Sequence, residues 1–245
     1  MNVLTECLTQ GTSPVGVVSF AKEYLKQQGF EELYYNKMIS PKENSKYYIA
    51  PFPDVLFAFT TGAGKEMIQS LRMAFAHVDQ PCFKVKGKPD FKSMGCAMLN
   101  VEVYGGMMDH TWFDRPLGLA GTIVLKGEDV FNPIEVTYDS KRPVALIPGL
   151  AIHMQREANN GWKIDRQKEL MPLMGLANGR WTEDAFLHFL SEELSLPPSD
   201  HLLRSGYRHV LCLPYAAPQN HPAILAHHSD MPPVSWKYFP EDRSK

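Results

Sequence analysis

Residues 98–126 read MLNVEVYGGMMDHTWFDRPLGLAGTIVLK, and this stretch decides the fold class. Apolar and β-branched residues fill both of its ends, over 98–104 and 122–126, and predict two short strands. Gly105 and Gly106 permit a tight turn between them, and no lysine-bearing helix start follows, so a phosphate-binding loop is not indicated. Further β-like runs occur at 83–85, 134–138 and 144–147. The sequence therefore predicts a β-rich module in this part of the chain.

The residues before this module predict a helix and further strands. Over 14–29, apolar residues recur at helical spacing and a glycine ends the pattern. Two β-rich runs, 46–49 and 55–59, flank a Pro-Phe-Pro turn and predict a strand pair. Alternating apolar residues predict one more strand over 70–78. Together with the β-rich module, these elements indicate an α/β fold.

Two helices are predicted after the β-rich runs, and an irregular tail follows them. The first covers 150–157, after a proline, and the second covers 182–194, with Thr182 as a candidate N-cap. Residues 215–245 are rich in proline and histidine and show almost no periodic apolar pattern. We therefore expect a poorly ordered tail.

The composition indicates an ordinary globular protein and argues against several classes of partner. The chain has 25 basic and 27 acidic residues, so it offers no broad charged field for nucleic acid or an anionic membrane. No apolar run approaches the roughly 20 residues of a membrane span, and no secretory signal is visible at the start. We therefore expect no membrane association and a cytoplasmic location. No CxxC pair occurs, which predicts reduced thiols at Cys7, Cys82, Cys96 and Cys212.

His77 and Asp79 are the residues with the clearest chemical potential. They are two positions apart, so both side chains would lie on one side of the end of the strand predicted over 70–78. A neutral imidazole can bind a divalent metal while a neighbouring carboxylate holds its other ring N–H. By spacing alone, a structural histidine with a hydrogen bond is the favoured interpretation and a metal ligand is the alternative.

Several blocks in order resemble the aspartyl and vacuolar aminopeptidases, a family of dinuclear zinc metallopeptidases. The blocks are AHVDQPCFKVK at 76–86, the stretch from NVEVYGG to LAG at 100–121, and IPGLAIHM at 147–154, with LMPL at 170–173 after it. The first block departs from the family's usual His-Thr-Asp-Ser-Pro. The resemblance covers the chain from about residue 5 to about residue 213. It favours the interpretation of the His77–Asp79 pair as part of a metal site.

The resemblance implies the N-terminal half of a zinc-aminopeptidase α/β sandwich, interrupted by a β-rich dimerisation domain. Residues 1–86 would belong to the catalytic domain and residues 87–213 to the inserted domain, with a return toward the catalytic domain near its end. The β-rich texture that begins near Cys82 agrees with such an insertion. Residues 214–245 match nothing expected of the family and form a divergent tail.

The same resemblance assigns roles to individual residues. His77 would bind one metal, zinc or a similar divalent ion, and Asp79 would orient the catalytic apparatus. His110 would reach into the site of a neighbouring subunit and contact the substrate, although several family members have Asn there. The expected partners are peptide substrates and further copies of the chain, held through the inserted domain as a homo-oligomer.

The expected activity is removal of N-terminal residues from peptides, with acidic residues as candidates. A two-metal site needs a bridging carboxylate, further ligands and a general base. The family places these after the inserted domain, so we expect a partial site and doubtful activity. The alternatives are a noncatalytic remnant that associates with full-length subunits, and a small β-rich binding module. A weaker hypothesis adds tail ligands to His77, namely His221, His227, His228 and Asp230.

Overall fold

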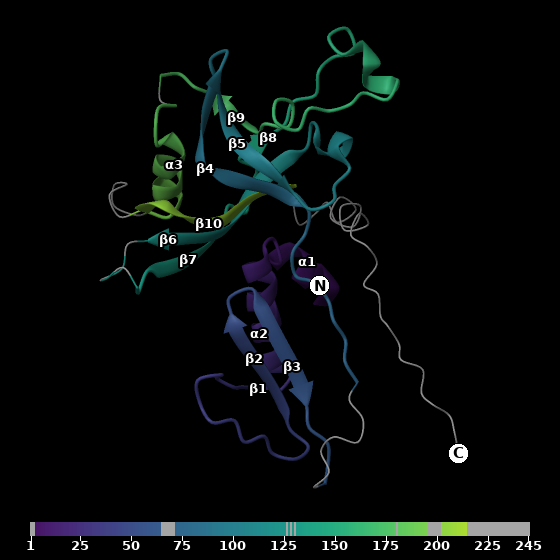
Figure 1. Ribbon diagram of the computed structural model, residues 1–245, viewed down its shortest axis with the longest axis vertical. Helices are drawn as coiled ribbons and strands as arrows, with labels where there is room; N and C mark the ends of the chain where they lie inside the picture. Colours follow the sequence, from purple (N-terminus) through teal and green to yellow (C-terminus); the bar gives the residue numbers. More distant parts are fainter. Residues whose placement is uncertain are drawn as a thin grey trace.

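A three-stranded sheet and a seven-stranded sheet make up the molecule, as Figure 1 shows for this computed structural model. The structure describes residues 3–64, 72–125, 127, 129, 131–179 and 181–195, together with the backbone of residues 202–214. The tail from residue 215, including its histidines, lies outside the described residues. Among those that are described, no helix has the length and apolar character to cross a membrane. The cytoplasmic location stays a prediction.

The N-terminal part carries two helices beside the small sheet. Ser13 begins the second helix, because its hydroxyl accepts a hydrogen bond from the Gly16 backbone N–H at 3.2 Å. The sheet has the order β1-β2-β3, and an ion pair of 2.8 Å between Lys22 and Glu32 links β1 to the second helix. The elements are α1 Val3–Gln10, α2 Pro14–Gln27, β1 Glu31–Glu32, β2 Lys46–Phe52 and β3 Val55–Thr60. The predicted helix over 14–29 and the predicted strand pair are confirmed.

The larger sheet closes on itself. Its order is β10-β4-β5-β9-β8-β6-β7, and β10 also pairs with β6, so the strands form a ring with β7 outside it. The strands are β4 Cys82–Ser93, β5 Cys96–Tyr104, β6 Pro116–Leu125, β7 Ile134–Asp139, β8 Ala145–Leu146, β9 Leu173–Leu176 and β10 Leu202–Pro214. Each β-like run predicted from residue 83 onward falls in or beside one of these strands, so the β-rich character of this part of the chain is confirmed. β9 and β10 were not predicted.

The main hydrophobic core belongs to the larger sheet and to α3, which spans Ala185–Glu193. Phe83 and Trp112 lie at its centre with edge-to-face rings whose centroids are 4.7 Å apart, and neither side chain is more than 1% exposed. Phe186 and Leu190 of α3 pack into the same cluster. Trp112, which lies in the quoted block 100–121, is therefore a core residue.

The prediction of a strand over 70–78 is wrong for residues 72–78, which the structure describes. Residues 72–80 have no regular secondary structure, and residues 70 and 71 lie outside the described ranges. Alternation of apolar residues favours a strand only where a neighbouring strand supplies hydrogen-bond partners, and no such pairing forms along the described part of this segment. Met73 and Phe75 are accordingly exposed.

The helix predicted over 150–157 is also wrong. The segment contains turns, and only Arg156–Asn159 forms a short 3-10 helix. Its apolar residues Leu150, Ile152 and Met154 are exposed, so no packed surface stabilises a helical face.

The third predicted helix exists, but Thr182 does not cap it. α3 begins at Ala185, and Asp184 precedes it with a positive φ of 64° and no capping bond from its side chain. The carboxylate of Asp90, on β4, instead accepts a hydrogen bond of 2.8 Å from the Phe186 backbone N–H. A residue distant in sequence therefore satisfies this helix start.

Phe83→Ala is expected to lower the free energy of unfolding by about 3–5 kcal/mol, because it leaves a cavity beside Trp112. Phe131→Ala removes the same atoms from a side chain that is 92% exposed, and should change stability by less than about 0.5 kcal/mol. Urea unfolding of both variants measures the difference. Equal destabilisation would contradict the position of the core.

Candidate functional site

His77 and Asp79 face each other on the extended segment that leads into β4. The Nδ1 atom of His77 lies 3.1 Å from Oδ1 of Asp79 and 2.8 Å from its backbone oxygen. Both side chains remain partly open to solvent, at 50% and 42% exposure. The predicted pairing of imidazole and carboxylate is present, although it sits on an irregular segment rather than at a strand end.

Tyr104 holds the other side of the carboxylate. Its hydroxyl donates a hydrogen bond of 2.5 Å to Oδ2 of Asp79, so each carboxylate oxygen has a separate partner. The register of the sheet explains the contact, because Tyr104 at the end of β5 lies opposite Cys82 at the start of β4. The ammonium group of Lys84 lies 3.9 Å from the centre of the Tyr104 ring. Sequence reasoning assigned no role to Tyr104 or Lys84, although both lie within the quoted family blocks.

These contacts keep Asp79 ionised. The hydrogen bond from Tyr104 is the largest cause that lowers the pKa of Asp79, with His77 as a smaller one, while partial burial opposes them. The same bond raises the pKa of Tyr104 to about 12, so the phenol keeps its proton and remains a donor.

The arrangement leaves one nitrogen of His77 for a ligand bond. If Nδ1 carries the proton that is donated to Asp79, the lone pair resides on Nε2, for which no hydrogen bond occurs among the described residues. An imidazole oriented by a carboxylate in this way has the chemistry of a zinc ligand. The pair therefore fits a metal ion as one ligand with its orienting partner. Within the described ranges, no group of three His, Cys, Asp or Glu side chains is placed to bind a metal.

A cavity lies directly beside Asp79. Its volume is about 280 Å³, which is smaller than the cavity of about 490 Å³ described below. Asp79, Lys84 and Tyr104 line this smaller cavity together with Ser13 and Pro14 at the start of α2. Asp79 of the candidate pair therefore borders a hollow between the N-terminal part and the larger sheet.

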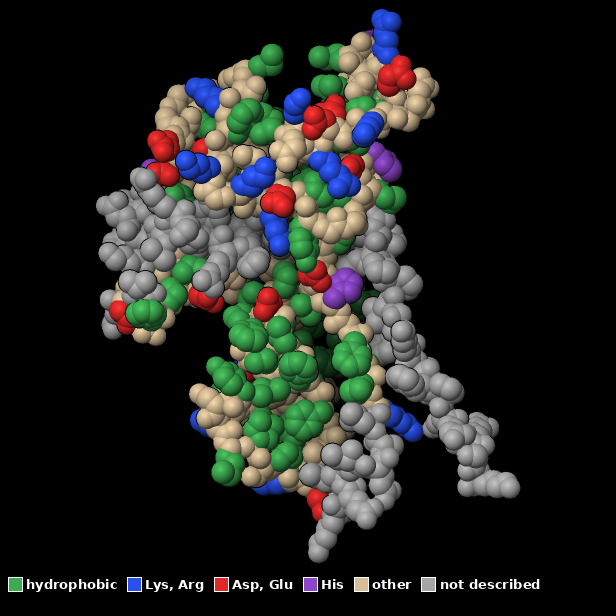
Figure 2. All heavy atoms as spheres, in the orientation of Figure 1, with side chains coloured by type: hydrophobic (Ala, Val, Ile, Leu, Met, Phe, Trp, Pro, Cys, Tyr) green, Lys and Arg blue, Asp and Glu red, His purple; other side chains and the backbone are tan. Residues whose placement is uncertain are grey.

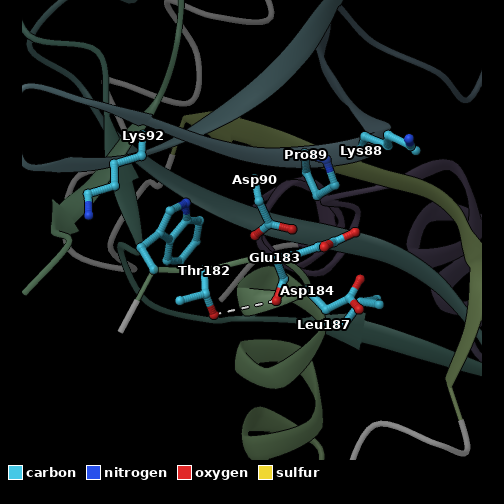
Figure 3. A pocket seen from close by; sticks show the side chains of 10 residues that line it. Lys88, Pro89, Asp90, Lys92, Thr182, Glu183, Asp184 and Leu187 are labelled. Atoms are coloured by element: carbon cyan, nitrogen blue, oxygen red, sulfur yellow. Dashed lines mark hydrogen bonds between the residues drawn. The ribbon is translucent and has the colours of Figure 1, made fainter. Parts of the chain in front are cut away.

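The larger cavity lies elsewhere, between β4 and the start of α3, and Figure 3 shows its lining. The carboxylates of Asp90, Glu183 and Asp184 are grouped there. Burial is the main cause that raises the pKa of Asp90, and the hydrogen bond from Phe186 opposes it. No histidine lines this cavity. The Asp90 carboxylate accepts the hydrogen bond from the first turn of α3, so we assign this group of carboxylates a structural role.

His110 does not join the pair. It is exposed on the 3-10 helix η1, Asp109–Trp112, where Arg166 binds Asp109 at 2.7 Å and Trp112 is buried. No hydrogen bond connects His110 with His77 or Asp79 in the described part of the chain. The structure thus brings together two of the three predicted site residues.

Comparison with known proteins identifies the family. Residues 7–200 match the family described as aminopeptidase I zinc metalloprotease (M18). The chain belongs to the M18 peptidase family. Its relatives include a probable M18 family aminopeptidase 2 of Clostridium acetobutylicum, 34% identical over 185 residues, which cover 75% of this chain and 43% of the relative. A protein of the same name from Pseudomonas putida strain F1 is 33% identical over 192 residues, covering 78% of this chain and 44% of that protein.

Solved structures show the same fold. A chain in the cryo-EM structure of the Ape4 and Nbr1 complex matches with a TM-score of 0.71 and 24% identity, over 87% of this chain and 43% of that chain. An M18 aminopeptidase from Thermotoga maritima matches with a TM-score of 0.65 and 20% identity, over 87% and 46%. The α/β fold class is therefore confirmed. The chain spans less than half the length of the relatives it matches.

Gly105→Ala is expected to destabilise the protein by about 1–2 kcal/mol, because residue 105 has a φ of +79° that L side chains rarely adopt. An added Cβ would also lie 3.3 Å from the Cα of Pro81, close to the candidate pair. Gly106→Ala is the matched control, since nothing lies within 4 Å of its added Cβ. Thermal or urea unfolding compares the two, and equal stability of both variants would contradict the explanation.

Tyr104→Phe is expected to raise the pKa of Asp79 toward its ordinary value, because the donated hydrogen bond is lost. The lowered pKa means that ionised Asp79 stabilises the fold above the unfolded-state pKa, and that this contribution disappears as the pH falls through the folded-state pKa. NMR titration of the Asp79 carboxyl carbon measures the shift. Tyr138→Phe, which removes a hydroxyl bonded to Glu193 instead, should leave Asp79 unchanged. An unshifted Asp79 titration in Tyr104→Phe would disprove the assignment.

Proposed function

We propose that this chain supplies one portion of a zinc aminopeptidase that removes N-terminal residues from peptides. The observation that supports the proposal is the His77 imidazole held through Nδ1 by Asp79, which leaves Nε2 as a metal ligand. Membership of a zinc metalloprotease family gives this geometry its chemical meaning.

Each residue of the network has a distinct task in this proposal. His77 binds one ion through Nε2, Asp79 fixes the tautomer and ring orientation, and Tyr104 fixes Asp79. When bound, zinc supplies Lewis acidity and lowers the pKa of water, which permits peptide hydrolysis near neutral pH. The ionised state of Asp79 also adds negative charge beside the imidazole, which strengthens its binding to a cation.

The remaining ligands and the general base come, in this proposal, from polypeptide that the relatives possess and this chain does not span. A two-ion site needs more donors than one histidine. The described residues contain no group of three donors, and the match covers only 43% of the Clostridium acetobutylicum relative. The number of ions and a preference for acidic N-terminal residues are parts of the same proposal.

Oligomer formation is a further part of the proposal. One structural neighbour, at a TM-score of 0.62, is the mApe1 of S. cerevisiae, solved as a dodecamer. We propose that residues 87–213 provide subunit contacts and that exposed His110 contacts substrate in a neighbouring subunit. The proposed boundary after residue 86 falls inside β4, so the strand itself would connect the catalytic part with the inserted part.

A second candidate function is a noncatalytic subunit that associates with other M18 subunits through the same region. The lack of a three-donor metal group among the described residues favours it. Zinc binding and turnover of aminoacyl reporters, measured on the same preparation, separate the two candidates. Turnover supports the enzyme, whereas assembly without turnover supports the noncatalytic subunit.

His77→Ala is expected to weaken zinc binding at this site at least tenfold, because it removes the ligand, and Asp79→Asn should weaken it about 10–100-fold through loss of orientation. Competition with a chromophoric chelator measures both effects without requiring activity. His153→Ala, at an exposed histidine in a turn, is the matched control and should bind zinc normally. Equal zinc affinity of His77→Ala and the unmodified chain would rule out the proposed ligand.

A further inference from the structure

Lys84 places a positive charge in the smaller cavity, the one that Asp79 also lines. Its ammonium group lies 3.9 Å from the centre of the Tyr104 ring. Glu102 is directly opposite Lys84 in the register of β4 with β5, yet no ion pair forms between them. In the described part of the chain, no oxygen accepts a hydrogen bond from this ammonium group. Its N–H donors can therefore bind a ligand in the cavity.

Asp54 supplies the opposite charge from another part of the molecule. It lies in the turn between β2 and β3, at the end of the small sheet nearest the larger sheet (Figure 1). It lines the same cavity as Lys84. Among the residues that the structure describes, no cation pairs with Asp54 and no donor bonds to its carboxylate. Asp79, the other carboxylate of the lining, already has a partner on each oxygen.

The cavity presents both charges to one small ligand. Lys84 and Asp54 are not joined by an ion pair, so neither charge is neutralised by the other. The volume of about 280 Å³ lies below the roughly 300–1,000 Å³ that is typical of sites for drug-sized ligands. Pro14, Val15 and Val78 add an apolar part to the lining. The space therefore suits a small ligand with an anionic group, a cationic group and a short apolar part.

The surface of the molecule also fits a ligand without net charge. Figure 2 shows Lys and Arg side chains interspersed with Asp and Glu over the larger sheet, so neither sign dominates this face. The whole chain has a formal net charge of −2. Long-range attraction of anions or of cations is consequently weak. A zwitterion does not depend on such attraction, and each of its groups meets a complementary side chain in the cavity.

We propose that this cavity binds a small free α-amino acid, with its carboxylate at the Lys84 ammonium group and its own ammonium group at the Asp54 carboxylate. Hydrogen bonds between charged groups are about twice as strong as those between neutral groups. The proposal rests on the proposed function only for the origin of the ligand, since hydrolysis at the N-terminus of a peptide releases an amino acid. Binding itself requires neither zinc nor turnover.

The experiment compares a zwitterion with its two halves. L-Alanine, propionate and ethylamine are titrated separately into the full 245-residue chain in the presence of a chelator, and NMR follows the backbone amides of Gln80 and Gly121 in the cavity lining. We expect saturable binding of L-alanine that shifts both amides. Propionate and ethylamine should bind about tenfold more weakly or worse, because each makes only one of the two charged contacts. Absence of saturable alanine binding, or equal binding of either half, would overturn the proposal.

Variants that remove one charge then locate the contacts. Lys84→Met and Asp54→Asn should each weaken L-alanine binding about tenfold or more, whereas Lys84→Arg keeps the positive charge and should retain most of the affinity. Lys88→Met and Glu135→Gln remove exposed charges outside this cavity and are the matched controls, with unchanged affinity. Normal alanine binding by Lys84→Met or Asp54→Asn would show that the amino acid binds elsewhere.

The amino-acid site and the zinc ligand can fail independently. His77 does not line the cavity, so His77→Ala should bind L-alanine normally even though its zinc affinity falls. If the unmodified chain binds zinc through His77 but does not bind alanine, the amino-acid site is wrong and the proposed function stands. If alanine binds as expected but His77→Ala keeps its zinc affinity, the reverse holds.

Discussion

The carboxylate of Asp79 connects the irregular segment after the small sheet with the larger sheet. One oxygen faces the His77 ring and the other accepts the Tyr104 hydroxyl. The segment itself has no strand pairing in its described part, so side-chain contacts rather than a ladder orient the imidazole. The register of β4 with β5 therefore matters to the proposed metal ligand, since it brings Tyr104 to this carboxylate.

Local sequence patterns predicted those elements that depend mainly on residues close together in the chain. Helical spacing and a terminating glycine were sufficient for α2, and β-rich runs were sufficient for most strands of the ring. The pairing of His77 with Asp79 was also predictable, because two residues in an extended chain project to one side. The family resemblance, carried by ordered blocks, added the zinc chemistry that spacing alone could not supply.

The features that sequence reasoning missed depend on contacts between distant residues. The start of α3 is held by Asp90, which precedes it by almost a hundred residues, so Thr182 looked like a cap from its local context alone. Tyr104 became part of the site only through the register of two strands. The predicted strand over 70–78 failed for the converse reason, because its apolar alternation lacks a partner in the described structure.

The double pairing of β10 has a consequence for biosynthesis. Because β10 bonds both β4, which begins at Cys82, and β6, the ring cannot close until a segment ending at Pro214 is available. Such long-range pairing is slow compared with local helix formation. During translation, β4 to β8 would emerge from the ribosome as an open sheet with exposed edges, and would need protection until the closing strand arrives.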